Sequence, residues 1–415
     1  MELKRIKSIA FFLACVCLII QVYVLFTYGD FTPKSDAGAY VNYAEECFAA
    51  NEWYPMHRHL YTNYLFAPGF VNFLIFQLRL FGTLEYNMFI NLLLSWAIIA
   101  EIWIIAKTIF NECSAWITVI FNSLLYSTWV YFLPPMTEIP FLFLVLTAFV
   151  LCLKSQNIFV LFVAGVFFCV ANWIRPLAII YIIVTLLYMF LKKYRYPLYI
   201  SLFAAYFGSI LLIGTFTKSK IGEFAYKSST GGVNLIMAAN DDANGTYNAL
   251  CFADSSKIGY IYNSDKVTFV ERDSIWIDRS INWIKDHPFE YFTSYLKRIP
   301  YLYVVEDHSD GIVEISHPSV SSSVGTNSFI NVILNRLLKN ITYYVIIIAF
   351  VLTVIFCRKD IFSVKGLFLL LLIMGTLGTC IFVVQPRYHS PFLFCMILWA
   401  SWGINKIISN RRKVF

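Results

Sequence analysis

The sequence predicts an all-α polytopic membrane protein with about ten transmembrane helices, an interfacial helix in the first outer loop and a mixed extracytoplasmic loop domain. Of its 415 residues, 59% are hydrophobic and only 14% are charged, and the mean hydropathy is +0.67. A soluble protein averages roughly 45–50% apolar and 25% charged residues. Apolar runs of about 20 residues recur along the chain, which is the length that a helix needs to cross the roughly 30 Å hydrocarbon core.

The first predicted span is the N-terminal apolar run. It follows the basic segment MELKRIK and so has the charge layout of a signal peptide, but it is too long for one and no A-x-A-like cleavage site follows it. We therefore expect a retained signal anchor. The ten predicted spans cover residues 8–28, 87–108, 114–133, 138–153, 157–174, 177–191, 198–217, 341–357, 364–384 and 391–408.

The distribution of Lys and Arg predicts how these spans are oriented, because basic residues in short loops favour the cytoplasmic side. Ten spans place all four basic clusters on that side, and the clusters lie at residues 4–7, 192–195, 358–365 and 411–413. Both termini are therefore expected to be cytoplasmic. The predicted localisation is the cell membrane (inner or plasma membrane), with a multi-pass topology.

One further apolar run, residues 64–82, complicates the count. If it crossed the membrane, the later basic clusters would lie outside and the acidic turn GTLE would become cytoplasmic, against the charge rule. We therefore expect an interfacial or re-entrant helix that opens at Pro68-Gly69. Its wide apolar stripe keeps a membrane span open as the alternative.

This topology divides the chain into three parts. Residues 1–217 form an N-terminal transmembrane module whose first outer loop is 29–86, and residues 341–415 form the C-terminal transmembrane helices. Between them, residues 218–340 are expected to form an extracytoplasmic loop domain. This domain contains a segment rich in Gly, Asn and Ser at 227–247, and then an amphipathic helical pattern over 278–303 that Pro288 interrupts.

The ten cysteines give no metal-binding pattern. Only Cys47 and Cys251 fall in predicted outer segments, where they form either one disulfide or two buried thiols. No C-x-x-C motif, H-E-x-x-H motif or cluster of His and Cys suggests a bound transition metal. No motif requires a cofactor, and a requirement for a divalent cation stays open.

Ionisable residues gather at the predicted outer rim. Within the spans, Glu101 is the only clear acidic residue, whereas an ion-coupled transporter usually keeps such groups near mid-membrane. The rim charges are Asp36, Arg58, Glu138, Arg175 and Arg387. A rim of carboxylates and arginines at this depth is typical of a site for a lipid phosphate and a polar acceptor.

Three of these residues lie beside helix-breaking sequence: Glu138 follows PPMT, Arg175 lies in NWIRP and Arg387 lies in QPRYHSP. Proline removes a backbone donor and disfavours helix in the residue before it, so each charged side chain is expected at a helix end. The alternative is that the arginines are interfacial anchors that extend to the lipid headgroups.

Seven motifs together resemble the GT-C class of integral membrane glycosyltransferases, especially the branch of protein O-mannosyltransferases and the lipid A aminoarabinose transferase. They occur in the order expected for that class and are distributed over most of the chain. The motifs are SDAGAYVNYAEE, FAPGFVNFLIFQLRLFG, PPMTEIPFLFLVL, ANWIRPLA, GGVNLIMAANDDANGTY, INWIKDHPFEYF and PRYHSPFLF.

The resemblance implies transfer of a hexosyl or pentosyl group from a polyprenyl-phosphate or polyprenyl-pyrophosphate donor to an extracytoplasmic glycan, lipid or protein acceptor, with inversion at the anomeric carbon. Asp36 matches the catalytic base of the first outer loop in that class, and Glu138 matches the second acidic position. The residues implied to line the sugar or acceptor pocket are Asn234, Asn240 and Tyr247. The class more often has Gly-Asn-Asn where this chain has Ala239, Asn240 and Asp241.

The chemistry of such a transfer agrees with the rim residues. A carboxylate can remove the proton of an acceptor hydroxyl as the new bond forms. The departing phosphate needs cationic stabilisation, and arginine offers a planar pair of donors for it. The residues predicted to bind the donor phosphate are Arg58, Arg175, Arg387 and Tyr388.

Two other functions stay open at this point. A lipid-linked glycan polymerase or ligase would have a similar architecture and transfer a larger glycan. A flippase or transporter of lipid-linked glycans would need a polar central pathway and repeated halves, and neither pattern is visible. Nucleic acid is not an expected partner, because the cytoplasmic flanks account for the net charge of +7.

Overall fold

The computed structural model describes residues 2–28, 33–306 and 329–411. Throughout these ranges the chain forms helices joined by turns and irregular segments, without any strand. The predicted all-α class is therefore confirmed. In its described part, the loop domain, which was expected to be mixed, contains helices joined by irregular segments and no strand.

Within these ranges, five helices are long and apolar enough to cross a membrane. These segments are Leu3–Tyr28, Asn87–Ile109, Tyr196–Ile221, Arg336–Phe356 and Pro386–Ser409. They belong to α1 (Glu2–Tyr28), α4 (Asn87–Ile109), α10 (Tyr196–Ile221), α16 (Phe329–Phe356) and α18 (Ser390–Arg411) with its preceding turn.

The other predicted spans coincide with shorter apolar helices. These are α5 (Glu112–Leu124), α7 (Glu138–Lys154), α8 (Ile158–Ile174), α9 (Ala178–Leu191) and α17 (Gly366–Cys380). A helix rises about 1.5 Å per residue, so a 14-residue helix such as α9 is only about 21 Å long. That length is less than the roughly 30 Å hydrocarbon core. Helices thus occur at all ten predicted positions, but half of them are shorter than a full span.

The predicted span 114–133 is wrong as a single helix. The chain leaves the helical conformation at Leu125, between α5 and the short helix α6 (Tyr126–Val130). Near this break, the Trp129 indole N–H donates to the carbonyl of Ser123 at 2.8 Å, so a side chain takes over a carbonyl that a continuous helix would use. The apolar composition hid this break.

The helix α3 (Pro68–Phe81) begins at the predicted Pro68. It packs against α8 and against α2 (Ser35–Ala49). At Gly69 an added Cβ atom would lie only 2.7 Å from the backbone nitrogen of Ile174 and from the carbonyl carbon of Trp173. This close approach fixes α3 against the last turn of α8, one residue before Arg175.

The segment after α10 folds into three helices: α11 (Gly231–Ala238), α12 (Phe269–Asp286) and α13 (Pro288–Leu302). The break between α12 and α13 falls at His287, where the sequence predicted an interruption. Val233, Met237 and Trp276 are among the residues that form a small core between α11 and α12.

Cys47 and Cys251 are both free and buried, so the structure has the two buried thiols rather than the disulfide.

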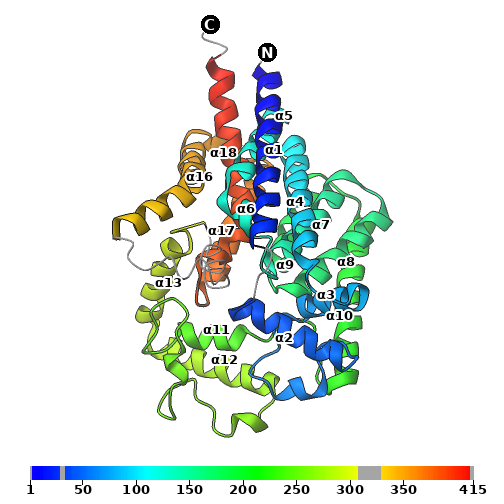
Figure 1. The fold of residues 1–415 in the computed structure, drawn as a ribbon, viewed down its shortest axis with the longest axis vertical. Coiled ribbons are helices and arrows are strands. Elements are labelled where there is room, and N and C mark those ends of the chain that lie inside the picture. Colours follow the sequence, from blue (N-terminus) through cyan, green and yellow to red (C-terminus); the bar gives the residue numbers. More distant parts are fainter. Residues whose placement is uncertain (1, 29–32, 307–328, 412–415) are drawn as a thin grey trace.

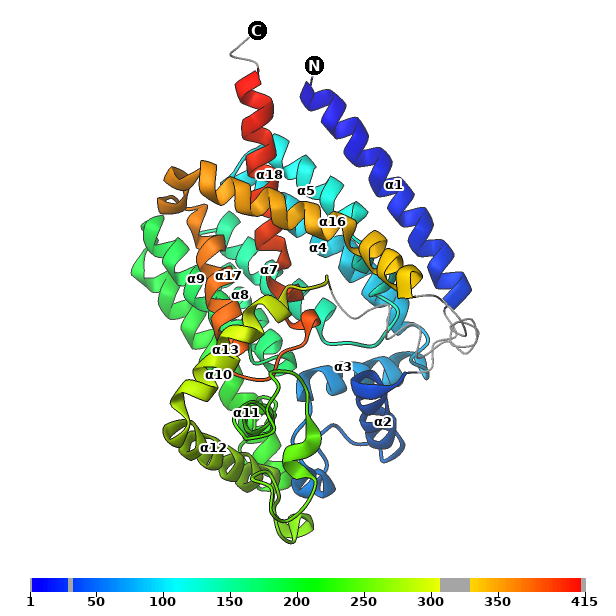
Figure 2. The same ribbon diagram turned by 90° about the vertical axis from the view of Figure 1, so that its left-hand side faces the viewer.

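The two ends of the molecule differ in content. The N-terminal end of α1 and the C-terminal end of α18 lie at the same end (Figure 1), as the predicted topology requires. The opposite end contains α2, α11 and α12, and it lies there in the perpendicular view as well (Figure 2). The side of the membrane that each end faces stays a prediction.

The contact at Gly69 predicts a stability effect. Gly69→Ala should destabilise the protein by about 1–3 kcal/mol, because the added methyl group meets backbone atoms that cannot rotate away. The measurement is the thermal unfolding midpoint of the purified protein in detergent. Gly208→Ala is the matched control, since an added Cβ there meets nothing within 4 Å. A Gly69→Ala variant as stable as the wild type would contradict the close packing of α3.

Candidate functional site

A cavity of about 880 Å³ lies where several helix ends meet. One wall consists of the start of α2, the start of α7 and the residues just after α8. The facing wall consists of lining residues between positions 227 and 277, which include parts of α11 and α12. Residues between 63 and 67, the end of α17 and the 3-10 helix η6 (Pro386–His389) complete the lining. The sequence-predicted site residues in the lining are Asp36, Glu138, Arg175, Asn234, Tyr247, Arg387 and Tyr388.

Asp36 lies in the first turn of α2, where the helix dipole favours a negative charge. Its carboxylate accepts a hydrogen bond from Nη2 of Arg387, which lies in η6 just before α18. The Arg387 side chain is 9% exposed and the Asp36 side chain is 35% exposed. The pair therefore joins the two ends of the chain, and the carboxylate stays open to the cavity.

Glu138 and Arg175 form a second ion pair in the same cavity. Oε1 of Glu138, in the first turn of α7, lies 2.7 Å from Nη1 of Arg175, which follows the last residue of α8. Both side chains are largely buried, with 6% and 14% exposed. Thr137 donates its hydroxyl to the other carboxylate oxygen at 3.2 Å. Two carboxylates and two guanidinium groups thus balance in charge at this wall.

The Arg387 guanidinium keeps donors that the protein does not use. In the described part of the chain, its Nε atom is buried and has no hydrogen-bond partner. Its Nη1 atom approaches only the sulfur of Met136, at 4.0 Å. An unused donor in a buried guanidinium is costly unless a ligand or water fills it. The N–H groups of these two nitrogens can therefore donate hydrogen bonds to the oxygens of an anionic ligand.

Tyr40 is a cavity residue that the sequence analysis missed. It lies one helical turn after Asp36 on α2, and its ring stacks on Phe66 with a 4.5 Å centroid distance. Burial raises the pKa of the Tyr40 hydroxyl well above its ordinary value; Asp36 and Glu138 add to the rise, whereas both arginines oppose it. The neutral hydroxyl thus lies in the field of all four charges. The i, i+4 spacing from Asp36 was the available signal.

Tyr388 lies beside both arginines. Its ring centroid is 5.5 Å from the guanidinium carbon of Arg387 and 5.9 Å from that of Arg175. These are cation–π distances, so the ring supports the positions of the two guanidinium groups.

The facing wall contributes further charged residues that the sequence analysis did not select: Lys227, Arg272 and Asp273. Burial raises the pKa of Asp273 above its ordinary value, and the N–H of Gly232 and the nearby Lys227 partly oppose this rise. Arg272 donates to the side chain of Asn63 at 2.8 Å, which ties α12 to the first outer loop. Only the fold brings these residues to the cavity, because more than 190 residues separate Asp273 from Asp36 along the chain.

Asn234 and Tyr247, predicted to contact the sugar or acceptor, both line the cavity. The main-chain carbonyl of Asn234 accepts a hydrogen bond from the N–H of Val383 at 3.4 Å, which holds α11 beside the end of α17. The Tyr247 side chain is 63% exposed. Both are therefore available to a ligand, and their roles stay predictions.

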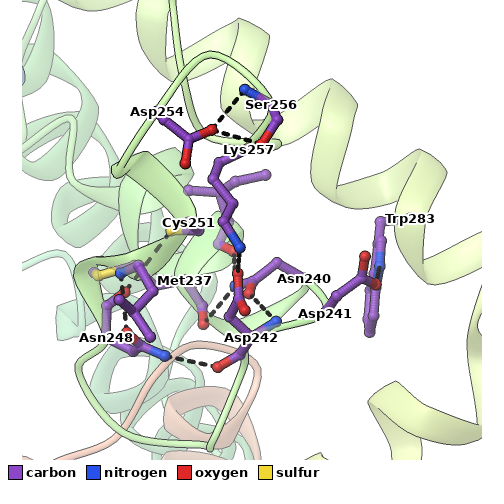
Figure 3. A network of polar contacts seen from close by, with 12 residues as sticks. Met237, Asn240, Asp241, Asp242, Asn248, Cys251, Asp254, Ser256, Lys257 and Trp283 are labelled. Atoms are coloured by element: carbon purple, nitrogen blue, oxygen red, sulfur yellow. Dashed lines mark hydrogen bonds and ion pairs between the residues drawn. The ribbon is translucent and has the colours of Figure 1, made fainter.

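Asn240, the third residue of that group, is not part of the cavity lining. Its side-chain amide donates to the carbonyls of Ile236 and Met237 at 2.7 and 3.1 Å and accepts from the N–H of Asp242. Asp242 in turn pairs with Lys257 at 2.7 Å. Figure 3 shows this network. In the structure, Asn240 thus shapes the loop after α11 rather than facing the cavity.

Arg58 also lies outside the cavity lining. Its guanidinium forms an ion pair with Glu46, and its side chain is 57% exposed. The local helical turn His57–Tyr61 brings it to α2 rather than to the cavity. We therefore leave Arg58 out of the candidate site.

Among the described residues, no three His, Cys, Asp or Glu side chains cluster as a metal-binding group.

The arrangement has the parts that group transfer from a phosphate requires. It has a partly exposed carboxylate, two arginines that are held in place and the Tyr40 hydroxyl in the field of these charges. Preorganised charges of this kind stabilise charge that develops in a transition state. The cavity is also large enough for a ligand of several rings, since small-molecule pockets range from about 300 to 1,000 Å³.

Comparisons with known proteins gave a likeness to solved structures but no sequence match. No protein-family model and no curated protein matches the sequence. Among solved structures, the archaeal oligosaccharyltransferase AglB from Archaeoglobus fulgidus, in complex with an inhibitory peptide and a dolichol-phosphate, has a TM-score of 0.49 and 12% sequence identity to this chain. The match covers 97% of this chain and 50% of the AglB chain. This chain therefore spans about half the length of that protein.

The buried Glu138–Arg175 pair predicts a large loss of stability on removal of one partner. Glu138→Gln should destabilise the protein by roughly 3–5 kcal/mol, because it leaves a buried guanidinium without its counter-charge. The matched control is Glu46→Gln, which breaks the more exposed pair with Arg58 and should cost roughly 0–1 kcal/mol. The measurement is thermal unfolding in detergent. Equal losses for the two variants would contradict the structural role of the buried pair.

Proposed function

We propose that this chain is a membrane glycosyltransferase that moves a sugar from a polyprenyl-phosphate or polyprenyl-pyrophosphate carrier to an acceptor hydroxyl in the cavity. The observation that carries the proposal is the pairing of Asp36 with Arg387 beside Glu138 and Arg175. The motif resemblance supports it from the sequence side. The cavity lies at the end opposite the two termini, so cytoplasmic termini would make the active site extracytoplasmic.

In this proposal Asp36 is the general base. Its carboxylate removes the proton of the acceptor hydroxyl while the acceptor oxygen forms its bond to the anomeric carbon of the sugar. The 35% exposure of the Asp36 side chain supports this role, because the base must lie within hydrogen-bond reach of the acceptor. The ion pair with Arg387 supports it too, because it holds the carboxylate at the cavity.

The leaving phosphate is assigned to the two arginines. As the bond between the anomeric carbon and the phosphate oxygen breaks, the electron pair stays on the phosphate, which departs as an anion. Nε and Nη1 of Arg387 can donate to its oxygens, and the guanidinium of Arg175 also lies near the Tyr388 ring. Charged hydrogen bonds from a planar guanidinium are strong and directional. Fixed cations at the leaving group therefore lower the barrier.

Glu138 is assigned a positioning role. Its carboxylate already binds Arg175 and lies deep in the wall, with 6% of the side chain exposed. It holds the guanidinium at the cavity and neutralises it when no phosphate is bound. The facing wall, with Asn234, Tyr247 and Trp276, supplies the polar and aromatic surface proposed for the sugar or the acceptor.

Replacement of Asp36 tests the base. Asp36→Asn should abolish sugar transfer while the protein still inserts into the membrane, because the asparagine keeps the size of the side chain and an oxygen that can accept a hydrogen bond from Arg387, but is not basic. The measurement is a mass-spectrometric profile of envelope glycans in cells that lack the chain and express the variant. Glu45→Gln, an exposed change on the same helix, is the matched control and should restore the wild-type glycans. Full restoration by Asp36→Asn would rule out Asp36 as the base.

Replacement of Arg387 tests the phosphate site. Arg387→Ala should weaken the binding of a polyprenyl phosphate to the purified protein roughly 10- to 100-fold, the amount expected for losing hydrogen bonds to a charged group. The measurement is a titration followed by intrinsic tryptophan fluorescence. Arg58→Ala should bind as the wild type does, because Arg58 lies outside the cavity lining. Unchanged affinity for Arg387→Ala would remove Arg387 from the phosphate site.

A further inference from the structure

The helix α13 exposes a row of large apolar side chains. Phe289, Phe292 and Leu296 are 81%, 58% and 48% exposed. Successive residues of an α-helix are about 100° apart, so these three positions lie on one side of α13. A row of this kind that faced water would be costly, because the hydrophobic effect favours its removal from water.

A second side of α13 is attached to the end of α17. The hydroxyl groups of Tyr291 and Tyr295 donate to the carbonyls of Ile381 and Leu377 at 2.7 and 3.0 Å. The Arg298 side chain is buried and donates to the carbonyl of Cys380 at 2.9 Å. Three side chains of α13 thus satisfy carbonyl groups at the end of an apolar helix. Figures 1 and 2 both show α13 beside α17.

The exposed surface of α17 is itself apolar and continues toward α13. Ile373, Leu377 and Ile381 are 46%, 45% and 43% exposed and follow one another at intervals of four residues. They form one stripe along a helix that the sequence predicts to lie in the membrane. Leu377 and Ile381 are also the residues whose carbonyls bind α13. The helix α13 is therefore attached beside a surface suited to lipid.

The third side of α13 is polar. Glu290 and Lys297 are exposed and lie about 100° away from the apolar row, on the same side as each other, since seven residues make nearly two turns. The helix therefore has an apolar side, a side attached to α17 and a charged side. This division is typical of a helix that lies at a membrane–water interface.

We propose that α13 lies in the membrane leaflet nearest the cavity, with Phe289, Phe292 and Leu296 among the lipid acyl chains. Glu290 and Lys297 face the headgroups and water. A lipid surface is the partner, because α13 is attached to the end of α17, which carries the exposed apolar stripe. The helix α12 directly precedes α13, with His287 between them, and carries Asp273 and Trp276 in the cavity wall. The leaflet therefore holds this wall at the depth of the membrane surface.

Photocrosslinking from single positions tests this proposal. The photoreactive residue p-benzoylphenylalanine replaces Phe292 in one full-length variant and Phe289 in another, and the purified proteins are reconstituted into vesicles of palmitoyl-oleoyl phosphatidylcholine. Tyr262 is the matched control, because it is also aromatic and is 77% exposed, but lies in the loop before α12. Each replacement keeps an aromatic ring at an exposed position, so folding should be retained. The readout after illumination is the mass of the protein.

The expected result is a phosphatidylcholine adduct when the photoreactive residue is at position 292 or 289, and no such adduct when it is at position 262. Three results would overturn the proposal: no lipid adduct at positions 289 and 292, equal adducts at all three positions, or a cross-link within the chain or to a second copy instead. The readout requires no sugar transfer. Its outcome is therefore independent of whether the proposed enzymatic function is correct.

Discussion

The ion pair between Asp36 and Arg387 is the contact on which the candidate site depends. It joins residues 351 positions apart in the sequence, from the first outer loop and from the turn before the last helix. Because Asp36 lies in the first turn of α2 and Arg387 in η6, the pair fixes the start of α2 against the start of α18. Neither side chain alone would make a site. Together they place a solvent-accessible carboxylate next to a buried cation with unused donors.

The surrounding packing keeps this pair in position. The close contact of Gly69 with the end of α8 holds Arg175 near the cavity, and Glu138 then fixes its guanidinium by an ion pair at 2.7 Å. Burying four charges in one wall is costly unless each is paired. The alternation of two carboxylates with two arginines meets that condition, and it leaves donors of Arg387 for a ligand. A neutral, preorganised wall is thus compatible both with a stable fold and with an anionic substrate.

The sequence predicted the all-α class, the start of α3 at Pro68 and the break at His287, because proline and apolar periodicity act locally. It also selected four of the charged cavity residues, since prolines place Glu138, Arg175 and Arg387 at helix ends and Asp36 follows the first span. It could not predict Asp273 or Arg272, which reach the cavity only through the packing of α12. It did not indicate that Arg58 pairs with Glu46 on α2 and lies outside the cavity lining. The break at Leu125 has no proline or glycine near it in the sequence, so no local signal marked it.

The central claim is that a sugar leaves a lipid phosphate in this cavity. The most direct measurement is a mass-spectrometric comparison of lipid-linked sugars in cells with and without the chain. The account predicts that one polyprenyl-linked sugar accumulates when the chain is absent, while one glycan loses that same sugar. An unchanged pool of lipid-linked sugars, together with complete glycans, would contradict it.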